Sequence, residues 1–441
     1  MLDVTHQLHR DHLLAHTGQQ KLFLLLTLKP GPEAIQARPP LAVAFVVDTS
    51  GSMRENVTAS GKGRNKMDLV IESLRGILMS GMLGAQDRVS LVQFDDRASV
   101  VLPMTSSAQR ARLMAGIERL DWHTGGTHMG AGMGLAREAL EGQEGSVRMV
   151  LLTDGQTSDE ALVRSETQKF AAKQIPVTTV GVGDEVNTDL LMLMTDQTQG
   201  KPIDVVPDTH NPQPPAVRAS DLPAVLLGDL RQSLSEVVTR VSLSVKTVKD
   251  VVLERVTRVH PTQTEVDIKQ QPMSLGNLAG QAGATFILEF TLPVRPPARI
   301  RLAQLGITFQ VPGAQFTGEL PPIDVVAEFT QNEEVAGRLK PEVMRFVQQR
   351  NIEGMLSQAI QEAQKNPQQA QKTLQMAREV TERLGSRTMT QALDRALQEI
   401  GQSKTLSAGT AKTLRIGSKT QTVKTADVPL TDEEIRRISG T

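Results

Sequence analysis

The stretch LAVAFVVDTSGSM, residues 41–53, decides the fold of the chain. The run LAVAFVV is apolar throughout and shows no alternation with polar residues, as expected for a strand of a parallel sheet that is buried on both faces. It leads directly into Asp48, Ser50 and Ser52, which place a carboxylate and two hydroxyls on one tight loop. In sheets of this kind, ligands bind at the carboxyl ends of the strands. We therefore expect a binding site in this loop.

Apolar runs continue to alternate with amphipathic stretches over residues 41–240. RVSLVQF (88–94) and PVTTVGVG (176–183) are strand-like, and the last amphipathic stretch predicts a helix over 220–238. Strands that alternate with helices in this way predict an α/β fold, with a doubly wound, mostly parallel sheet and helices on both faces. We assign the whole stretch to one α/β domain.

Two further loops are predicted to reach the same edge of the sheet. TGGT (124–127) precedes an expected helix, and the strand VRMVLLT (147–153) is followed by Asp154. Because the carboxyl ends of parallel strands share one edge, we expect the side chains of the three loops to converge there. The converging oxygen donors are two carboxylates and three hydroxyls, from Asp48, Ser50, Ser52, Thr127 and Asp154.

A donor set of carboxylate and hydroxyl oxygens suits a hard divalent cation such as Mg²⁺, and Mn²⁺ accepts similar donors. The chain contains no cysteine, which excludes thiolate zinc sites, iron–sulfur clusters, disulfides and a cysteine nucleophile. Two carboxylates and neutral hydroxyls leave a doubly charged ion open to one more anionic oxygen. A carboxylate of a partner protein would fit that position, and so would a phosphate or a water molecule.

The three motifs together resemble the metal-ion-dependent adhesion site of the von Willebrand factor A domain family, which includes integrin I domains and many bacterial intracellular proteins. DTSGSM (48–53), TGGT (124–127) and TDG (153–155) occur in the family order, and the α/β alternation around them agrees. The resemblance implies a Rossmann-like fold and protein binding rather than turnover of a substrate. The ligands that it implies are Ser50, Ser52 and Thr127, which would bind the metal directly or nearly so, and Asp48 and Asp154, directly or through water.

The segments on either side of the α/β domain have other patterns. Residues 241–330 carry alternating, β-branched runs between Gly and Pro turns, which predict antiparallel strands. Residues 1–40 contain the strand-like run LFLLLTL, so we expect 1–40 and 241–330 to form a discontinuous β-sandwich around the α/β domain. Over 335–401 the apolar period is helical and predicts a helical hairpin or small bundle. Residues 402–441 are rich in Thr and Lys, and we expect them to form a flexible tail.

The composition excludes several functions. Lys and Arg number 48 and Asp and Glu 49, and this balance argues against a chain that coats nucleic acid or an anionic membrane. Aromatic residues make up 2%, too few for a platform that stacks nucleic-acid bases. The apolar run 22–28 is too short to cross a bilayer and fits a signal peptide poorly. We therefore expect a cytoplasmic protein, without nucleic acid or membrane as partners.

Other residues are candidates for contacts with partners. Trp122, His123 and His128 flank the Thr127 motif and would form the rim on which a partner binds. A tryptophan packed beneath its own loop fits Trp122 equally, and loop histidines that hydrogen-bond a backbone carbonyl are the more ordinary interpretation of His123 and His128. Threonines in the expected tail lie among Lys and Arg, where a kinase and then a phosphothreonine-reading domain would recognise them. These candidates for phosphorylation are Thr410, Thr413, Thr420 and Thr422.

These observations favour a metal-dependent protein-binding module that uses Mg²⁺ or Mn²⁺ to capture an Asp or Glu of a partner protein, with regulation through the C-terminal tail. We do not expect an enzyme, because both carboxylates are committed to the metal and no nucleophile with an adjacent base is evident. Two alternatives stay open. One is a metal-assisted phosphohydrolase, and the other is an assembly or chaperone factor that works with an ATPase on another chain.

Overall fold

The structure is a computed structural model of the chain of 441 residues. By its internal contacts the chain divides into two compact units. Unit 1 comprises Met1–Gln36, Val237–Thr405 and Ser418–Thr441, and unit 2 comprises Ala37–Glu236 and Leu406–Gly417. The residues that the structure describes are 2–32, 39–56, 65–120, 125–183, 186–206, 216–280, 282–312 and 316–420.

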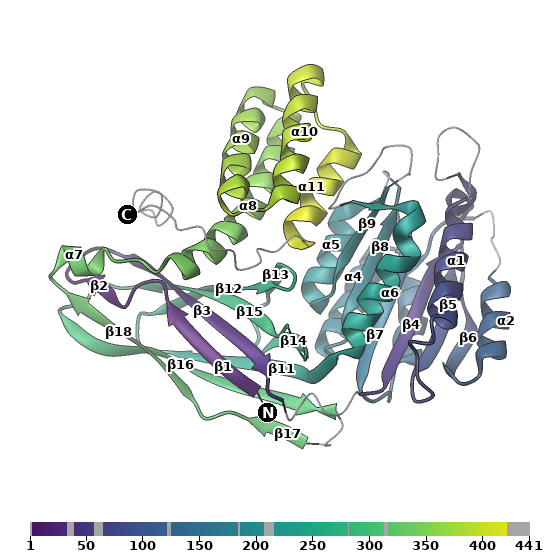
Figure 1. The fold of residues 1–441 in the computed structure, drawn as a ribbon, viewed down its shortest axis with the longest axis horizontal. Helices are drawn as coiled ribbons and strands as arrows, with labels where there is room; N and C mark the ends of the chain where they lie inside the picture. Colours follow the sequence, from purple (N-terminus) through teal and green to yellow (C-terminus); the bar gives the residue numbers. More distant parts are fainter. Residues whose placement is uncertain are drawn as a thin grey trace. The chain divides into compact units, whose positions relative to one another are not determined.

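Unit 2 is built, in its described residues, on a seven-stranded sheet with the order β10-β9-β8-β7-β4-β5-β6 (Figure 1). Neighbouring strands are parallel except β5 and β6, which are antiparallel. Every residue of β4 is buried, as its unbroken apolar run predicts for a central strand with both faces covered. The strands are β4 (Leu41–Asp48), β5 (Arg88–Phe94), β6 (Ala98–Ser106), β7 (Ser146–Thr153), β8 (Val177–Val182), β9 (Pro202–Val206) and β10 (Val217–Arg218).

Helices cover both faces of this sheet and confirm the predicted doubly wound α/β fold (Figure 1). One core lies under α1, α2 and α6, and the other lies under α3, α4 and α5. The helix expected over 220–238 is shorter, because the alternating, β-branched residues after Ser235 continue as a strand of unit 1. The helices are α1 (Lys66–Met79), α2 (Arg110–Glu118), α3 (Met129–Ala139), α4 (Glu160–Ala172), α5 (Thr188–Thr198) and α6 (Leu222–Leu234), with 3-10 turns η2 (Gly51–Arg54) and η4 (Ala219–Asp221).

Unit 1 contains two further sheets, with the orders β1-β3-β15-β12-β13 and β14-β11-β16-β18-β2. N-terminal strands contribute to both sheets: β3 pairs with β15, and β2 pairs with β18. The two sheets share one apolar core. The strands are β1 (Leu2–Leu8), β2 (His12–Leu14), β3 (Gln20–Pro30), β11 (Glu236–Thr247), β12 (Val252–His260), β13 (Thr264–Val266), β14 (Met273–Ala279), β15 (Ala284–Leu292), β16 (Ala298–Val311), β17 (Phe316–Glu319) and β18 (Ile323–Thr330).

The helical region of unit 1 begins on the surface of the first of these sheets. Val343, Met344 and Val347 of α8 pack against Phe23 and Ile287 on strands β3 and β15. A proline opens α9, and the side chain of Asn366 accepts a hydrogen bond from the backbone of the first turn, which explains the break between α8 and α9. The helices are α7 (Glu333–Ala336), α8 (Pro341–Ala363), α9 (Pro367–Arg383) and α10 (Arg387–Ser403).

The C-terminal segment differs from the flexible tail expected over 402–441. Residues 408–420 form helix α11 (Ala408–Thr420), and residues 421–441 lie outside the described part of the chain. Leu414 and Ile416 are buried in unit 2, although the sequence around them is polar. The tail expectation fails here because a few well-placed apolar residues and one buried ion pair, described below, hold the helix in place.

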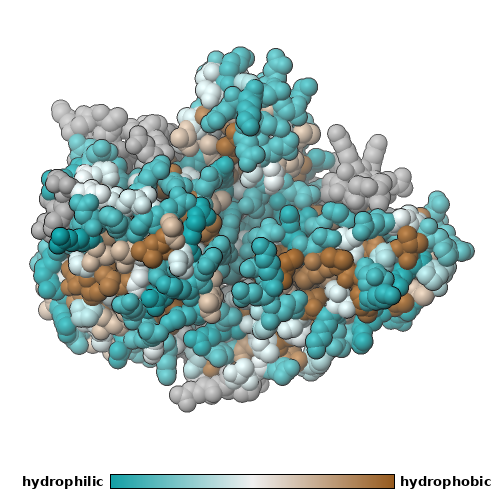
Figure 2. Space-filling model, turned by 180° about the vertical axis from the view of Figure 1, so that it is seen from behind, coloured by the Kyte–Doolittle hydropathy of each residue, from teal (hydrophilic) through white to brown (hydrophobic). Residues whose placement is uncertain are grey.

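The described helices are either too short or too polar to span a bilayer. Hydrophilic side chains cover most of the face shown in Figure 2, and the hydrophobic ones gather in separate groups. Large exposed hydrophobic side chains are distributed over both units, at Met79, Val100, Leu162, Val252, Val294, Val326 and Met376.

Candidate functional site

The candidate site starts where β4 ends. Asp48 is fully buried, and its carboxylate accepts hydrogen bonds from the backbone N–H of Ser50 at 2.9 Å and from the hydroxyl of Thr153 at 2.7 Å. Burial raises the pKa of Asp48 above its ordinary value, while the hydrogen bonds from Ser50 and Thr153 oppose that shift. The end of β4 is thereby tied to the end of its neighbour β7.

A continuous chain of polar contacts leads from the first loop to the second carboxylate. The hydroxyls of Ser50 and Ser52 lie 3.1 Å apart, and Ser52 donates to Asp154 Oδ1 at 2.8 Å. Ser50 and Asp154 are buried, and Ser52 is half-buried. The structure thus joins four of the five predicted donors at one edge of the sheet.

The fifth predicted donor, Thr127, belongs to the loop before α3. Its carbonyl accepts hydrogen bonds from Thr157 and Ser158, so this loop is held against the loop that follows Asp154. It is the main-chain carbonyl of Thr127 that makes these hydrogen bonds. A Cβ on Gly125 would clash with the carboxylate of Asp96. The β5–β6 turn therefore comes so close to residue 125 that only a glycine fits there.

Two acidic residues of the β5–β6 turn belong to this neighbourhood and were not predicted. Asp95 accepts a hydrogen bond from Thr49 at 3.2 Å, which fixes the first loop, and its carbonyl accepts from the backbone N–H of His128 at 2.8 Å. Asp96 accepts from the backbone N–H of Gly126. A pair of acidic residues after a strand is the signal that could have pointed to them.

Lys66 is a further residue of the site that the sequence patterns do not indicate. It is the first residue of α1, and its ammonium lies 2.5 Å from Asp154 Oδ2 and 3.2 Å from a carboxylate oxygen of Glu55. Burial alone would lower the pKa of Lys66, but the hydrogen bonds and charges of Asp154 and Glu55 outweigh burial and raise that pKa. A cation therefore neutralises the inner carboxylate of the site.

The chemistry of the donor set fits a hard divalent ion. The four connected side chains offer carboxylate and hydroxyl oxygens, which Mg²⁺ and Mn²⁺ prefer to the nitrogen and sulfur ligands that suit softer metals. Within the described residues no group of three or more His, Cys, Asp or Glu could hold a metal ion. A site of this kind would therefore depend on two carboxylates supplemented by hydroxyls.

The remaining predicted residues have different outcomes. His128 precedes α3, is half-buried, and its ring nitrogen Nδ1 lies 3.3 Å from the carbonyl of Asp95. Trp122 and His123 lie outside the described residues, and so does Thr422. Thr410 is in the first turn of α11 and Thr420 is its last residue, both half-buried.

A second buried polar cluster in unit 2 holds α11. The Lys412 ammonium lies 2.7 Å from Asp204 Oδ1 of β9, and both side chains are almost completely buried. The ammonium also donates to the carbonyls of Gly181 at 3.1 Å and Gly183 at 2.5 Å, at the end of β8. Thr413 donates to the other oxygen of Asp204 at 2.9 Å. These contacts of Lys412 and Thr413 explain why a basic, polar segment is ordered against the sheet.

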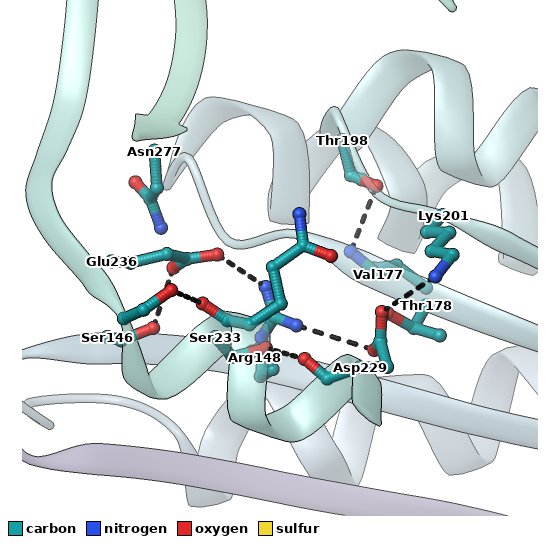
Figure 3. A network of polar contacts seen from close by, with 12 residues as sticks. Ser146, Arg148, Val177, Thr178, Thr198, Lys201, Asp229, Ser233, Glu236 and Asn277 are labelled. Carbon is teal, nitrogen blue, oxygen red and sulfur yellow. Dashed lines mark hydrogen bonds and ion pairs between the residues drawn. The ribbon is translucent and has the colours of Figure 1, made fainter. Parts of the chain in front are cut away.

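A third cluster connects α6 with the start of β7 and is drawn in Figure 3. Arg148 lies between Glu236, at 2.9 Å, and Asp229, at 3.5 Å. Ser146 donates to Glu236, and Lys201 approaches Asp229 at 3.6 Å. Arg148, Asp229 and Glu236 are buried, so the charge of Arg148 stabilises both carboxylates.

Comparisons with known proteins identify two regions of the chain. Residues 42–211 match the model of the von Willebrand factor type A domain, and residues 341–424 match the model of the Sll0103-like, C-terminal alpha-helical domain. The solved structure of a von Willebrand factor type A protein from Catenulispora acidiphila superposes with a TM-score of 0.76 at 16% identity, covering 96% of this chain and 97% of that chain. At this identity the likeness shows the shared fold.

Two curated relatives match part of the chain. The protein sll0103 of Synechocystis is 30% identical over 190 residues, which cover 42% of this chain and 42% of that protein. The protein YfbK of Escherichia coli is 27% identical over 183 residues, which cover 40% of this chain and 30% of that protein. The chain therefore matches less than half the length of each of these relatives.

Proposed function

Since residues 42–211 of this chain are a von Willebrand factor type A domain, commonly a metal-dependent protein-interaction module, we propose that the chain captures a partner protein through Mg²⁺ or Mn²⁺. The observation that carries the proposal is the continuous hydrogen-bonded chain from Asp48 through Ser50 and Ser52 to Asp154. Its ends are two carboxylates, and Mg²⁺ is commonly bound through one or two carboxylates. The side chains that would hold the ion are Asp48, Ser50, Ser52, Thr127 and Asp154.

The residues of the site would each contribute in a definite way. Hydrogen bonds from Ser50 and Thr153 hold the Asp48 carboxylate in one orientation before any ligand arrives, and Ser52 does the same for Asp154. A bound divalent ion would supply a Lewis-acidic position for a carboxylate oxygen of the partner, because two carboxylates neutralise it only in part. The partner would therefore present an Asp or Glu, and binding rather than catalysis would be the task of the site.

A pull-down with the intact chain tests this function. We expect a partner from the native host to be retained with Mg²⁺, released by a chelator and absent with Asp154→Asn. Asp3→Asn, which changes an exposed carboxylate of unit 1, is the matched control and should retain the partner. The proposal would be contradicted if the partner is retained in the presence of the chelator and is also retained by Asp154→Asn. Phosphatase turnover lost in Asp154→Asn would support a phosphohydrolase instead, and co-purification of an ATPase would support an assembly factor.

The tail regulation that the sequence suggested becomes a proposal about Thr413. Its hydroxyl donates to the buried carboxylate of Asp204, so a phosphate there would bring a second negative charge to an enclosed carboxylate. Phosphorylation of Thr413 would thus expel the segment 406–417 from the sheet. A kinase and a phosphothreonine-reading domain would be the partners of this step.

Thr413→Glu mimics that charge, and we expect faster hydrogen exchange over residues 406–417. Thr410→Glu is a control of the same chemistry with the opposite expectation. Ser407 accepts a hydrogen bond from the Thr410 backbone N–H, so a glutamate at 410 completes a capping box and favours the helix. Equal exchange in the two variants would rule out the charge-repulsion mechanism.

A further inference from the structure

A lysine in the first turn of a helix is electrostatically unfavourable, because the positive end of the helix dipole lies there. Lys66 is nevertheless the first residue of α1, and only 13% of its side chain is exposed. The carboxylates of Asp154 and Glu55 provide the compensating interactions. The position of this charge is therefore explained by the site and not by the helix.

The two carboxylates that bind Lys66 differ in their surroundings. Asp154 has a side chain with no exposed surface and also accepts from Ser52, whereas 70% of the Glu55 side chain is exposed. The Lys66 ammonium thus pairs with two carboxylates at once. One is buried and belongs to the proposed metal site, and the other is exposed to solvent beside it. Glu55 can therefore still bind the ammonium when Asp154 binds another cation.

We propose that Lys66 is a tethered internal cation that competes with the divalent ion for Asp154 and so sets the affinity of the site for metal, with Glu55 as its alternative partner. This inference rests on the proposed function, because it assumes that Asp154 is a metal ligand. A positive charge at hydrogen-bond distance from a ligand repels an incoming cation and also occupies one of its oxygens. Both effects weaken metal binding as long as Lys66 stays on Asp154.

The test is calorimetric titration of the intact chain with Mg²⁺ and with Mn²⁺. Lys66→Met keeps the aliphatic stem and removes the charge, and we expect the dissociation constant to fall about tenfold or more. Glu55→Gln removes the charge of the alternative partner, and we expect a rise of about threefold, because the ammonium then stays on Asp154. Lys169→Met is the matched control: its ammonium lies 2.7 Å from the buried carboxylate of Glu166 in the same unit. It should leave the constant unchanged.

The outcomes separate this inference from the proposed function. If the wild-type chain binds the ions and Lys66→Met binds them equally or more weakly, Lys66 does not compete and only this inference is overturned. If only Lys66→Met binds, the inference about Lys66 is supported, but the wild-type chain does not use these ions and the proposed function falls. If every variant fails to bind either ion while still unfolding cooperatively, the metal site itself is wrong and both proposals fall.

Discussion

Arg148→Met is expected to lower the free energy of unfolding of unit 2 by about 3–5 kcal/mol, because it removes the guanidinium that lies between two buried carboxylates. An apolar side chain would then lie between Asp229 and Glu236, and Lys201 lies 3.6 Å from Asp229. Hydrophobic burial by the methionine cannot offset an uncompensated buried charge. Urea unfolding followed by hydrogen exchange over the described strands of the unit 2 sheet measures the loss.

The control is Arg164→Met in the same unit. Arg164 pairs with Glu160 at 2.6 Å on an exposed surface of α4, with nearly half of each side chain accessible. Such a pair contributes less than about 1 kcal/mol because water competes with it. Equal losses in the two variants would show that the cluster drawn in Figure 3 is not the buried electrostatic centre described above.

Lys412→Met is expected to release the segment 406–417, with protection from hydrogen exchange falling about a hundredfold or more. With Lys412 replaced, the buried carboxylate of Asp204 loses the only cation within 4.0 Å among the residues that the structure describes. The segment can restore hydration to Asp204 by leaving the sheet. Because the segment can leave the sheet, the loss of stability cannot exceed the free energy with which the segment docks. The sheet of unit 2 should therefore stay folded. Exchange measured by mass spectrometry locates the change.

Two variants make this prediction specific. The double substitution Lys412→Met and Asp204→Leu removes both charges, and we expect it to recover most of the lost protection, because neither group is then buried alone. Lys173→Met removes a lysine from an exposed pair with Glu141 at 2.6 Å and should leave exchange over 406–417 unchanged. If the double variant is as unprotected as Lys412→Met, the unpaired carboxylate of Asp204 is not the cause of the release.

The sequence predicted the parts of the molecule that local patterns encode. The apolar run before Asp48 indicated a central parallel strand, and β4 pairs with parallel neighbours on both sides. The donors Ser50, Ser52 and Asp154 follow strands, so the topology of the sheet alone brings them to one edge. Burial on both faces and periodicity are local properties, which explains why this much could be predicted.

The parts that could not be predicted depend on long-range pairing of charged groups. Lys66 contacts Asp154, and Lys412 contacts Asp204, across large separations in the sequence. A lysine in a polar stretch resembles any solvated surface residue, because nothing in its neighbours reveals a buried carboxylate elsewhere in the fold. For the same reason the polar sequence after residue 402 predicts a tail, although the contacts of Lys412 hold residues 408–420 as helix α11.

Calorimetric titration of Mg²⁺ into the intact wild-type chain, and in parallel into Asp48→Asn, shows whether the site binds a divalent ion. The proposed function requires saturable uptake at a single site in the wild type, and no uptake in Asp48→Asn, whose fold a thermal unfolding curve would verify. Folded wild-type chain that takes up neither Mg²⁺ nor Mn²⁺, or an Asp48→Asn variant that binds as tightly as the wild type, would contradict it.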